Sequence, residues 1–237
     1  MRYSPAPSLV ILACLAFPCP RPARAQSAPT NTPPPVSFQD ISRAMGQAQT
    51  IFTRFTQERH LSLFVEPLRS EGYLCFQKPG HVRWETTTPY RSILLSDGTG
   101  VAQFEWLDGR WSKLELGLAD ALQHVLAQIG SVMEGQYSGK SGAYAASVKT
   151  ETAGPVITLV PQDERIRKVM AQIEVHLAGN LKAVRRVVLR ENGGDYTDIQ
   201  FTEQVASLTF PPRTFDRNAP ADLDPIRKAA VKALPSR

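Results

Sequence analysis

Regular alternation of apolar and polar residues, broken at short intervals by turn residues, is the feature that most constrains the fold of this chain. From about Phe52 onward the apolar residues recur with a period of two, which places them on one face of a β-strand. Turn sequences such as Lys78-Pro79-Gly80 and Asn192-Gly193-Gly194 separate these runs at intervals of roughly 8 to 16 residues. The pattern predicts about ten or eleven strands joined by hairpins, an antiparallel meander that is either a barrel or a deeply curved sheet.

The predicted strands carry bulky apolar residues at alternate positions and end at turn residues. Besides the run that starts near Phe52, they are 73–77, 82–86, 92–96, 101–107, 111–116, 143–150, 156–161, 169–177, 183–191 and 196–202. The turn after Gln77 decides one register. An odd-numbered or bulged loop pairs Leu74 with Trp84 and Phe76 with Val82, whereas an even-numbered loop would oppose the same two residues with charged ones. We predict the first register because it keeps charge off the apolar face.

Two segments depart from the strand pattern and predict helices. Ser37 and Asp40 form a capping box at the start of a short amphipathic helix, whose apolar residues are Phe38, Ile41, Met45, Ala48 and Phe52. In the middle of the chain, an apolar stripe with helical spacing consists of Leu118, Leu122, Val125, Leu126 and Ile129. Such helices can cover the mouth of a curved sheet, or they can pack on its outside.

The N-terminus has the organisation of an export signal. Arg2 precedes an apolar run over 8–17, and Ala23-Arg24-Ala25 offers the small-x-small pattern that signal peptidase reads. We expect a signal peptide over 1–25, cleaved after Ala25, and a soluble exported protein. The alternative is a lipoprotein with a lipobox before Cys14, which would leave only a few apolar residues ahead of the cleavage point.

The rest of the chain is expected to be one domain with extended ends. Residues 26–36 form a Pro-rich leader, disordered or extended, and residues 37–218 form the domain. Residues 219–237 are polar and bounded by proline, so we expect a flexible, solvated tail.

Charge and chemistry exclude several classes of protein. The net charge of +5 falls to +2 without residues 1–25, which hold three arginines and no acid, so there is no basic surface for nucleic acid. The four histidines are scattered without partners at ligand spacing, so no metal site is expected. Cys75 is the only cysteine after residue 25; it has no basic partner, and we expect it to be a buried core residue. No nucleophile elbow is present, so we expect neither an enzyme nor a cofactor.

A family resemblance rests on several short segments in a fixed order. They are Phe55-Thr56-Gln57-Glu58, Gly72-Tyr73-Leu74-Cys75-Phe76-Gln77-Lys78-Pro79-Gly80, Val82-Arg83-Trp84-Glu85, Pro89 and Ser92-Ile93-Leu94-Leu95-Ser96-Asp97-Gly98. Together with 187–191, 197–201 and 210–212, this order resembles the LolA family of periplasmic outer-membrane lipoprotein carriers. Segments 58–61, 66–70 and 161–165 are more similar to a divergent subgroup that serves glycolipid or polyene exporters.

The resemblance implies a mainly β fold, a half-open antiparallel β-barrel closed by short helices that act as a lid. Composition alone favours a packed core, but the resemblance implies a lipid-binding cavity lined by Phe52, Phe55, Leu74, Phe76, Val82, Trp84, Ile93, Leu95, Phe104 and Trp106. It makes Leu118, Leu122, Val125, Leu126 and Ile129 the underside of the lid. The family has an arginine where this chain has Lys78, which is therefore either a candidate latch or a plain turn lysine.

The function implied is that of a monomeric periplasmic carrier for acylated lipoproteins or lipids. Its partners would be an inner-membrane transporter as donor and an outer-membrane acceptor. Two alternatives stay open: a glycolipid carrier serving a membrane exporter, and a lipid-sensing module that signals to a protein partner.

Overall fold

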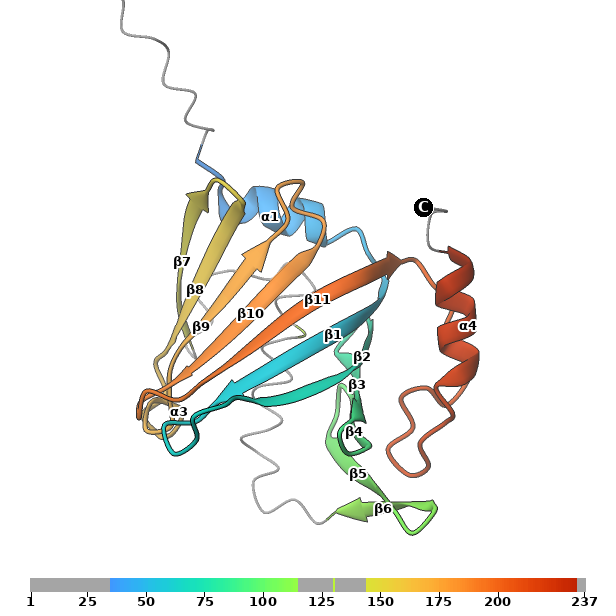
Figure 1. Cartoon of the computed structure of the whole chain (residues 1–237). Coiled ribbons are helices and arrows are strands. Elements are labelled where there is room, and N and C mark those ends of the chain that lie inside the picture. The colour runs from blue at the N-terminus through green and yellow to red at the C-terminus, as the bar shows by residue number, and fades with distance from the viewer. Residues whose placement is uncertain (1–34, 115–129, 131–143, 234–237) are drawn as a thin grey trace, which may run out of the picture. The chain divides into compact units, whose positions relative to one another are not determined.

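Eleven strands form one antiparallel sheet in a computed structural model that describes residues 35–114, 130 and 144–233 (Figure 1). The strands are β1 Thr50–His60, β2 Leu68–Gln77, β3 His81–Thr88, β4 Ser92–Asp97, β5 Val101–Leu107, β6 Arg110–Leu114, β7 Tyr144–Glu151, β8 Gly154–Pro161, β9 Met170–Leu177, β10 Val184–Glu191 and β11 Tyr196–Ala206. The predicted signal peptide and nearly all of the predicted leader lie outside the described residues.

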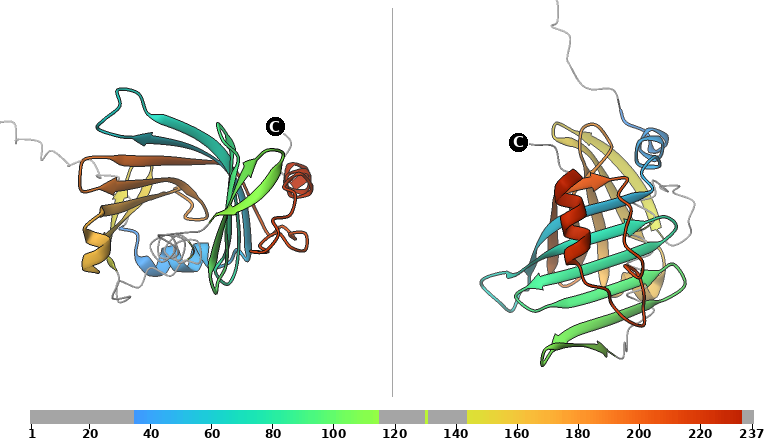
Figure 2. Two further views of the ribbon diagram at one scale, coloured as in Figure 1. Left: turned by 90° about the horizontal axis from the view of Figure 1, so that it is seen from below. Right: turned by 90° about the vertical axis from the view of Figure 1, so that its right-hand side faces the viewer.

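The sheet consists of two meanders joined along β1 and β11. Its order is β6-β5-β4-β3-β2-β1-β11-β10-β9-β8-β7, so β6 and β7 are the two edges and the sheet is not closed. Every pairing is antiparallel, and the sheet curves strongly (Figure 2). The predicted antiparallel meander and the mainly β, half-open fold class are confirmed.

The register predicted for the hairpin between β2 and β3 is confirmed. Leu74 lies opposite Trp84 and Phe76 opposite Val82, across a three-residue turn whose Gly80 has a φ of 64°. This positive φ is the left-handed conformation that glycine adopts without strain. The turn therefore keeps the apolar residues of both strands on the same face.

The first predicted helix is α1, Phe38–Met45. The Ser37 hydroxyl accepts a hydrogen bond from the Asp40 backbone N–H, and the Asp40 side chain accepts one from the Ser37 backbone N–H. Two of the backbone donors at the start of the helix are thereby satisfied. Ile41 and Met45 are buried, whereas Phe52, which also fits the helical spacing, belongs to β1.

Two short helices were not predicted. The segment 164–167 forms α3, Glu164–Arg167, in the connection between β8 and β9. The expected solvated tail instead contains α4, Asp224–Ala233, which lies against the sheet on the side opposite α1 (Figure 2). Leu223, Ile226 and Ala230 form a buried cluster with Phe52 and Cys75. Only three apolar positions make this contact. The remaining surface of the helix faces water and carries charged residues, so the apolar positions do not stand out in the sequence.

The sheet therefore has two covered faces. We call the face that contacts α1 the inner face, and the face that contacts residues 208–233 the outer face. Strand residues alternate between them, so in β1 to β3 the residues of each parity are buried by a different partner.

Candidate functional site

The inner face carries a continuous apolar cluster that spans both meanders. Residues of β1, β2 and β3 contribute on one side, and residues of β7 to β11 on the other, with α1 packed between them (Figure 1). The buried members are Ile41, Met45, Ile51, Phe55, Leu74, Phe76, Val82, Tyr144, Ile157, Leu159, Ile173, Val175, Leu177, Val184, Val187, Ile199 and Phe201. A surface of this composition can receive hydrocarbon without desolvating charge.

Three aromatic rings connect the two meanders near the centre of this face. The Trp84 ring lies 4.3 Å from the Phe55 ring and 6.2 Å from the Phe201 ring, between centroids. Phe55 is fully buried, and Trp84 is half-buried, so part of the indole stays accessible from the inner side. Trp84 is therefore the aromatic residue of this group best placed to contact a bound apolar molecule.

Five of the ten residues predicted to line a cavity share the inner face. Phe55, Leu74, Phe76, Val82 and Trp84 all contribute to the apolar cluster, with Trp84 as a partly buried member. Their strand partners place them there: Leu74 lies opposite Trp84, and Phe76 opposite Val82.

The other five lie on the outer face, so the ten do not form one wall. Phe52 stacks on Tyr73 at 5.5 Å in the cluster beneath α4. Ile93, Leu95 and Phe104 pack together in a separate cluster with Trp111, and Trp106 meets Trp111 at 5.1 Å. The expectation of a single face is corrected because residues 208–233 cover the outer side of β1 to β3, and the outer residues of β4 to β6 pack on one another. Both strand parities are consequently apolar there, and apolar character alone does not identify the face.

Sequence reasoning missed the inner-face residues of the second meander. Ile157, Leu159, Ile173, Val175 and Ile199 are buried in the cluster, across from the first meander. Each lies in a predicted strand, and Ile173, Val175 and Ile199 alternate with polar neighbours, so part of the signal was present in the sequence. What was lacking was the pairing of β1 with β11, which brings the two meanders onto one face.

Lys78 connects the β2–β3 turn to the end of α1. Its ammonium group donates a hydrogen bond of 2.6 Å to the carbonyl oxygen of Gly46, the residue that ends the helix. Its backbone N–H donates a second bond, of 3.0 Å, to the Gln49 carbonyl. Through these two hydrogen bonds, Lys78 restrains the chain at the C-terminal end of α1.

The predicted lid residues lie outside the described residues. Leu118, Leu122, Val125, Leu126 and Ile129 fall in this category. Gly130, the one described residue of that segment, is helical and buried, and a Cβ built on it would lie 4.0 Å from the Phe76 ring. This residue therefore faces the apolar cluster.

Few polar groups of the described chain stand near this face. The Tyr144 hydroxyl is buried with no hydrogen-bond partner among the described residues, and burial raises its pKa.

The described residues offer little reactive chemistry elsewhere. Burial raises the pKa of the Cys75 thiol to about 12, so this outer-face cysteine is unreactive near neutral pH. Within the described ranges, no three His, Cys, Asp or Glu side chains gather to hold a metal, and no helix is long and apolar enough to cross a membrane.

Comparisons with known proteins identify the family. The sequence model of the family "Outer membrane lipoprotein carrier protein LolA" matches residues 46–218. An outer-membrane lipoprotein carrier protein of Methylococcus capsulatus is 28% identical over 183 residues, which cover 76% of this chain and 82% of that protein.

Solved structures show more distant similarity. A LolA superfamily protein from Nitrosomonas europaea aligns with a TM-score of 0.41 at 8% identity, over 76% of this chain and 96% of that one. A chain in the complex structure of Pseudomonas aeruginosa MucA/MucB aligns with a TM-score of 0.35 at 19% identity, over 75% of this chain and 58% of that one. With the family model matching from the end of α1 through β11, this chain belongs to the LolA family of outer membrane lipoprotein carrier proteins.

Proposed function

We propose that this protein is a periplasmic, non-enzymatic carrier that shelters the acyl chains of lipoproteins, or of related lipids, against its inner face during transfer between the inner and outer membranes. The observation that carries the proposal is the apolar inner face, which extends across both meanders of an open sheet. Family membership supports the same function. An inner-membrane transporter would be the donor and an outer-membrane protein the acceptor.

The distribution of buried charge supports this choice of face. Arg83 and Glu85 are the buried charged residues of the described chain; they pair with each other, and Arg83 bonds to residues 214 and 221 on the outer face. The inner cluster is therefore free to exchange one apolar partner for another. Between the residues that the structure describes, no buried ion pair has to be broken when hydrocarbon enters this cluster.

The physical problem for such a carrier is the cost of exposing hydrocarbon to water. An acyl chain of about 16 carbons costs roughly 12 kcal/mol to expose, at about 0.8 kcal/mol per CH₂. At 1.4 kcal/mol per tenfold, unaided escape from a bilayer is suppressed by about nine orders of magnitude. A carrier removes this barrier with an apolar surface comparable to the bilayer, and near-balance with donor and acceptor then allows the cargo to be handed over.

The helical stripe from Leu118 to Ile129 completes the proposal as the lid over the inner face. Lys78 would act on this cover indirectly, through its hydrogen bond to the end of α1. Opening would then involve α1 and the lid together.

A pair of tryptophan substitutions tests the assignment of the face. Trp84→Ala removes an inner-face ring, whereas Trp106→Ala makes the same chemical change on the outer face. We expect Trp84→Ala to weaken retention of a fluorescent diacylated lipopeptide by about tenfold, as expected from the loss of a buried aromatic contact. Trp106→Ala should change retention by less than about twofold.

The measurement is lipopeptide binding by fluorescence anisotropy, with thermal unfolding as the check that both variants are folded. Brominated acyl chains should also quench Trp84 fluorescence, seen as the difference between the parent and Trp84→Ala. Equal retention by the two variants, or retention lost only in Trp106→Ala, would contradict the proposal.

A further inference from the structure

The exposed large apolar side chains of the described residues all lie at one end of the sheet. We call this the tip end: β1 finishes there, β2 begins there, and β3 and β5 finish there. In the second meander, β8 and β10 finish there and β9 and β11 begin there. The nine residues are Leu63, Phe64, Val65, Leu68, Tyr90, Trp106, Leu107, Val160 and Val169. An apolar surface restricted to one end of a protein marks an interaction site.

Three consecutive residues of this set, Leu63, Phe64 and Val65, lie in the turn between β1 and β2, at the lower left of Figure 1. Leu63 is 84% exposed, Phe64 54% and Val65 completely, so the described part of the protein leaves two of these three consecutive apolar residues almost unburied and the third half-exposed. Isolated exposed apolar residues are common on protein surfaces, but a run of three at a chain reversal is not. We call residues 61–67 the tip loop.

The backbone of the tip loop is held in place by hydrogen bonds. The Phe64 N–H donates to the Leu61 carbonyl at 2.9 Å, which closes a turn. The Ser62 N–H donates to the Asp195 carboxylate at 2.7 Å, which ties the loop to the turn between β10 and β11. The apolar side chains therefore extend from a restrained backbone, and little conformational entropy is lost when they bind.

Outside the tip loop, the exposed apolar residue Val169 lies beside basic residues at the same end of the sheet. Val169 follows Arg167 and Lys168, and both of these are exposed. The Asn192 side chain donates a hydrogen bond to the Arg167 carbonyl, so the β10–β11 turn contacts this segment as well as the tip loop. Asp163 pairs with Arg165 at 3.3 Å, and Glu164 is the second acid of this segment, so with Arg167 and Lys168 the segment carries one positive charge in excess.

We propose that the tip end docks on an anionic phospholipid bilayer. Leu63, Phe64 and Val65 enter the interface between headgroups and acyl chains, and Arg167 and Lys168 contact the phosphates. Apolar residues at a projecting turn with cations beside a second apolar residue are the arrangement found in interfacial membrane binding. A bilayer offers a flat, deformable surface that two separate loops can meet at once. A protein partner would need a socket shaped for each of them.

This docking rests on the proposed function and extends it, because a carrier that exchanges cargo with proteins in two membranes must first approach each membrane. Its test is nevertheless independent of cargo. Protein-free vesicles of phosphatidylethanolamine and phosphatidylglycerol are sedimented with the protein, and the bound fraction is measured. Leu63→Ser with Val65→Ser should lower the partition coefficient by at least about tenfold.

Two matched charge reversals test the electrostatic part. Lys168→Glu at the tip end should weaken binding to anionic vesicles by about fivefold or more, less so at high salt. Lys182→Glu makes the same change on an exposed lysine at the opposite end of the sheet, and should alter binding by less than about twofold. Both lysines are exposed, so neither substitution should disturb the fold.

Several results would overturn the docking proposal. The proposal is wrong if the parent does not bind protein-free vesicles, or if the Leu63→Ser, Val65→Ser variant binds them as the parent does. It is also wrong if Lys168→Glu and Lys182→Glu change binding equally. Binding only to vesicles that contain inner-membrane proteins would assign the tip end to a protein partner instead. Trp84→Ala should bind vesicles as the parent does, so loss of lipopeptide retention with intact vesicle binding would contradict the carrier proposal alone.

Discussion

At the scale of single residues, Gly72 allows β1, β2 and β3 to approach closely at the centre of the sheet. It lies opposite Phe55 on β1 and opposite Thr86 on β3, next to an irregularity in the β2–β3 register. A Cβ at this position would overlap the backbone carbonyl of Glu85 and lie 2.8 Å from the Phe55 ring. The missing side chain therefore leaves space for an inner-face aromatic residue that contacts Trp84.

This packing predicts a large effect for a small substitution. Gly72→Ala should lower the free energy of unfolding by about 3 kcal/mol, because a backbone carbonyl cannot move aside as a flexible side chain can. Gly193→Ala is the matched control: a Cβ there meets no atom within 4 Å, so the change should stay below about 0.5 kcal/mol. Urea unfolding followed by circular dichroism measures both. Equal midpoints for the two variants would show that the close approach at Gly72 is relieved at no cost.

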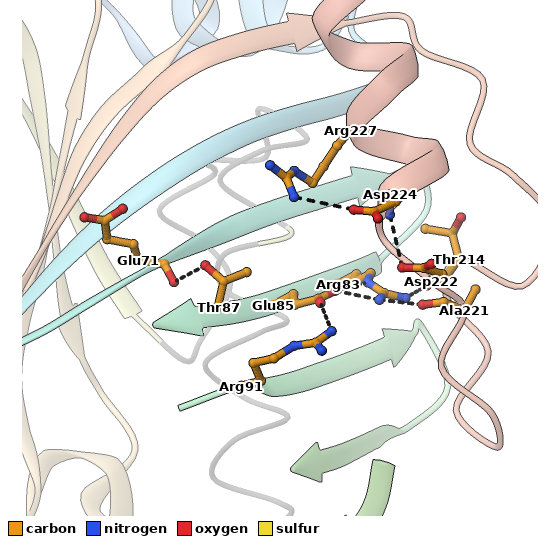
Figure 3. Close-up of polar contacts among 10 residues, drawn as sticks. All are labelled: Glu71, Arg83, Glu85, Thr87, Arg91, Thr214, Ala221, Asp222, Asp224 and Arg227. Carbon is orange, nitrogen blue, oxygen red and sulfur yellow. Dashed lines mark hydrogen bonds and ion pairs between the residues drawn. The ribbon is translucent and has the colours of Figure 1, made fainter. Parts of the chain in front are cut away.

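At the scale of elements, the C-terminal segment is bound to the outer face through a buried guanidinium group (Figure 3). Arg83 is fully buried and donates hydrogen bonds to the Thr214 carbonyl at 3.2 Å and the Ala221 carbonyl at 2.7 Å. It also pairs with Glu85 at 2.5 Å. Burial raises the pKa of Glu85, although the positive charge of Arg83 opposes this. Because the guanidinium group is planar and has several donors, this one side chain bonds both to Glu85 on β3 and to carbonyl groups of the segment before α4.

The pair predicts a strong asymmetry between single and double variants. Arg83→Met should lower the free energy of unfolding by about 3 to 5 kcal/mol, because it removes the buried partner of the Glu85 carboxylate and leaves only Arg91, at 4.0 Å, as a counter-charge. Arg83→Met with Glu85→Leu should recover most of that loss. In the single variant the folded pKa of Glu85 lies further above its unfolded value, so stability is retained at low pH and falls as pH rises through the folded pKa.

Urea unfolding at several pH values between 4 and 8 checks this prediction. The double variant, which has no carboxylate at this position, should lack the added pH dependence. A double variant no more stable than Arg83→Met at neutral pH would mean that the bonds to Thr214 and Ala221, rather than the charge balance, dominate.

At the scale of the whole described domain, α1 is the element that contacts both meanders on the inner face. Ile41 and Met45 are buried in the cluster that joins them, and the Lys78 ammonium group bonds to the end of the helix. Release of α1 would uncover the inner face along the open side of the sheet. The helix and its lysine are therefore the described parts best placed to control access.

Removing this contact should loosen α1 without unfolding the sheet. Lys78→Met should raise amide hydrogen exchange in α1 by about tenfold, which corresponds to the loss of one charge-assisted hydrogen bond. Lys182→Met, an exposed lysine in the turn between β9 and β10, is the control and should leave these rates unchanged. Hydrogen exchange followed by mass spectrometry resolves the helix from the strands. Unchanged exchange in α1 would leave Lys78 as an ordinary turn lysine.

The sequence predicted most of the strands and the β2–β3 register because these depend on local information. Alternating residues show which positions share a face, and Gly80 permits the turn that aligns Leu74 with Trp84. It did not predict α4, whose three buried positions acquire meaning only when the outer face is present to cover them. Likewise, it placed Phe52 and Phe104 with Trp84, because apolar character does not distinguish two faces that are both covered.

By itself, then, the sequence determined an antiparallel β meander with an N-terminal helix, since alternation, turn residues and a capping box all act between near neighbours. Only the tertiary structure decided that β1 pairs with β11, which joins the two meanders, and that residues 208–233 cover the outer side. These contacts link residues more than a hundred positions apart. Their free energy comes from surfaces that exist only after the sheet has formed, so no local pattern encodes which face remains for a ligand.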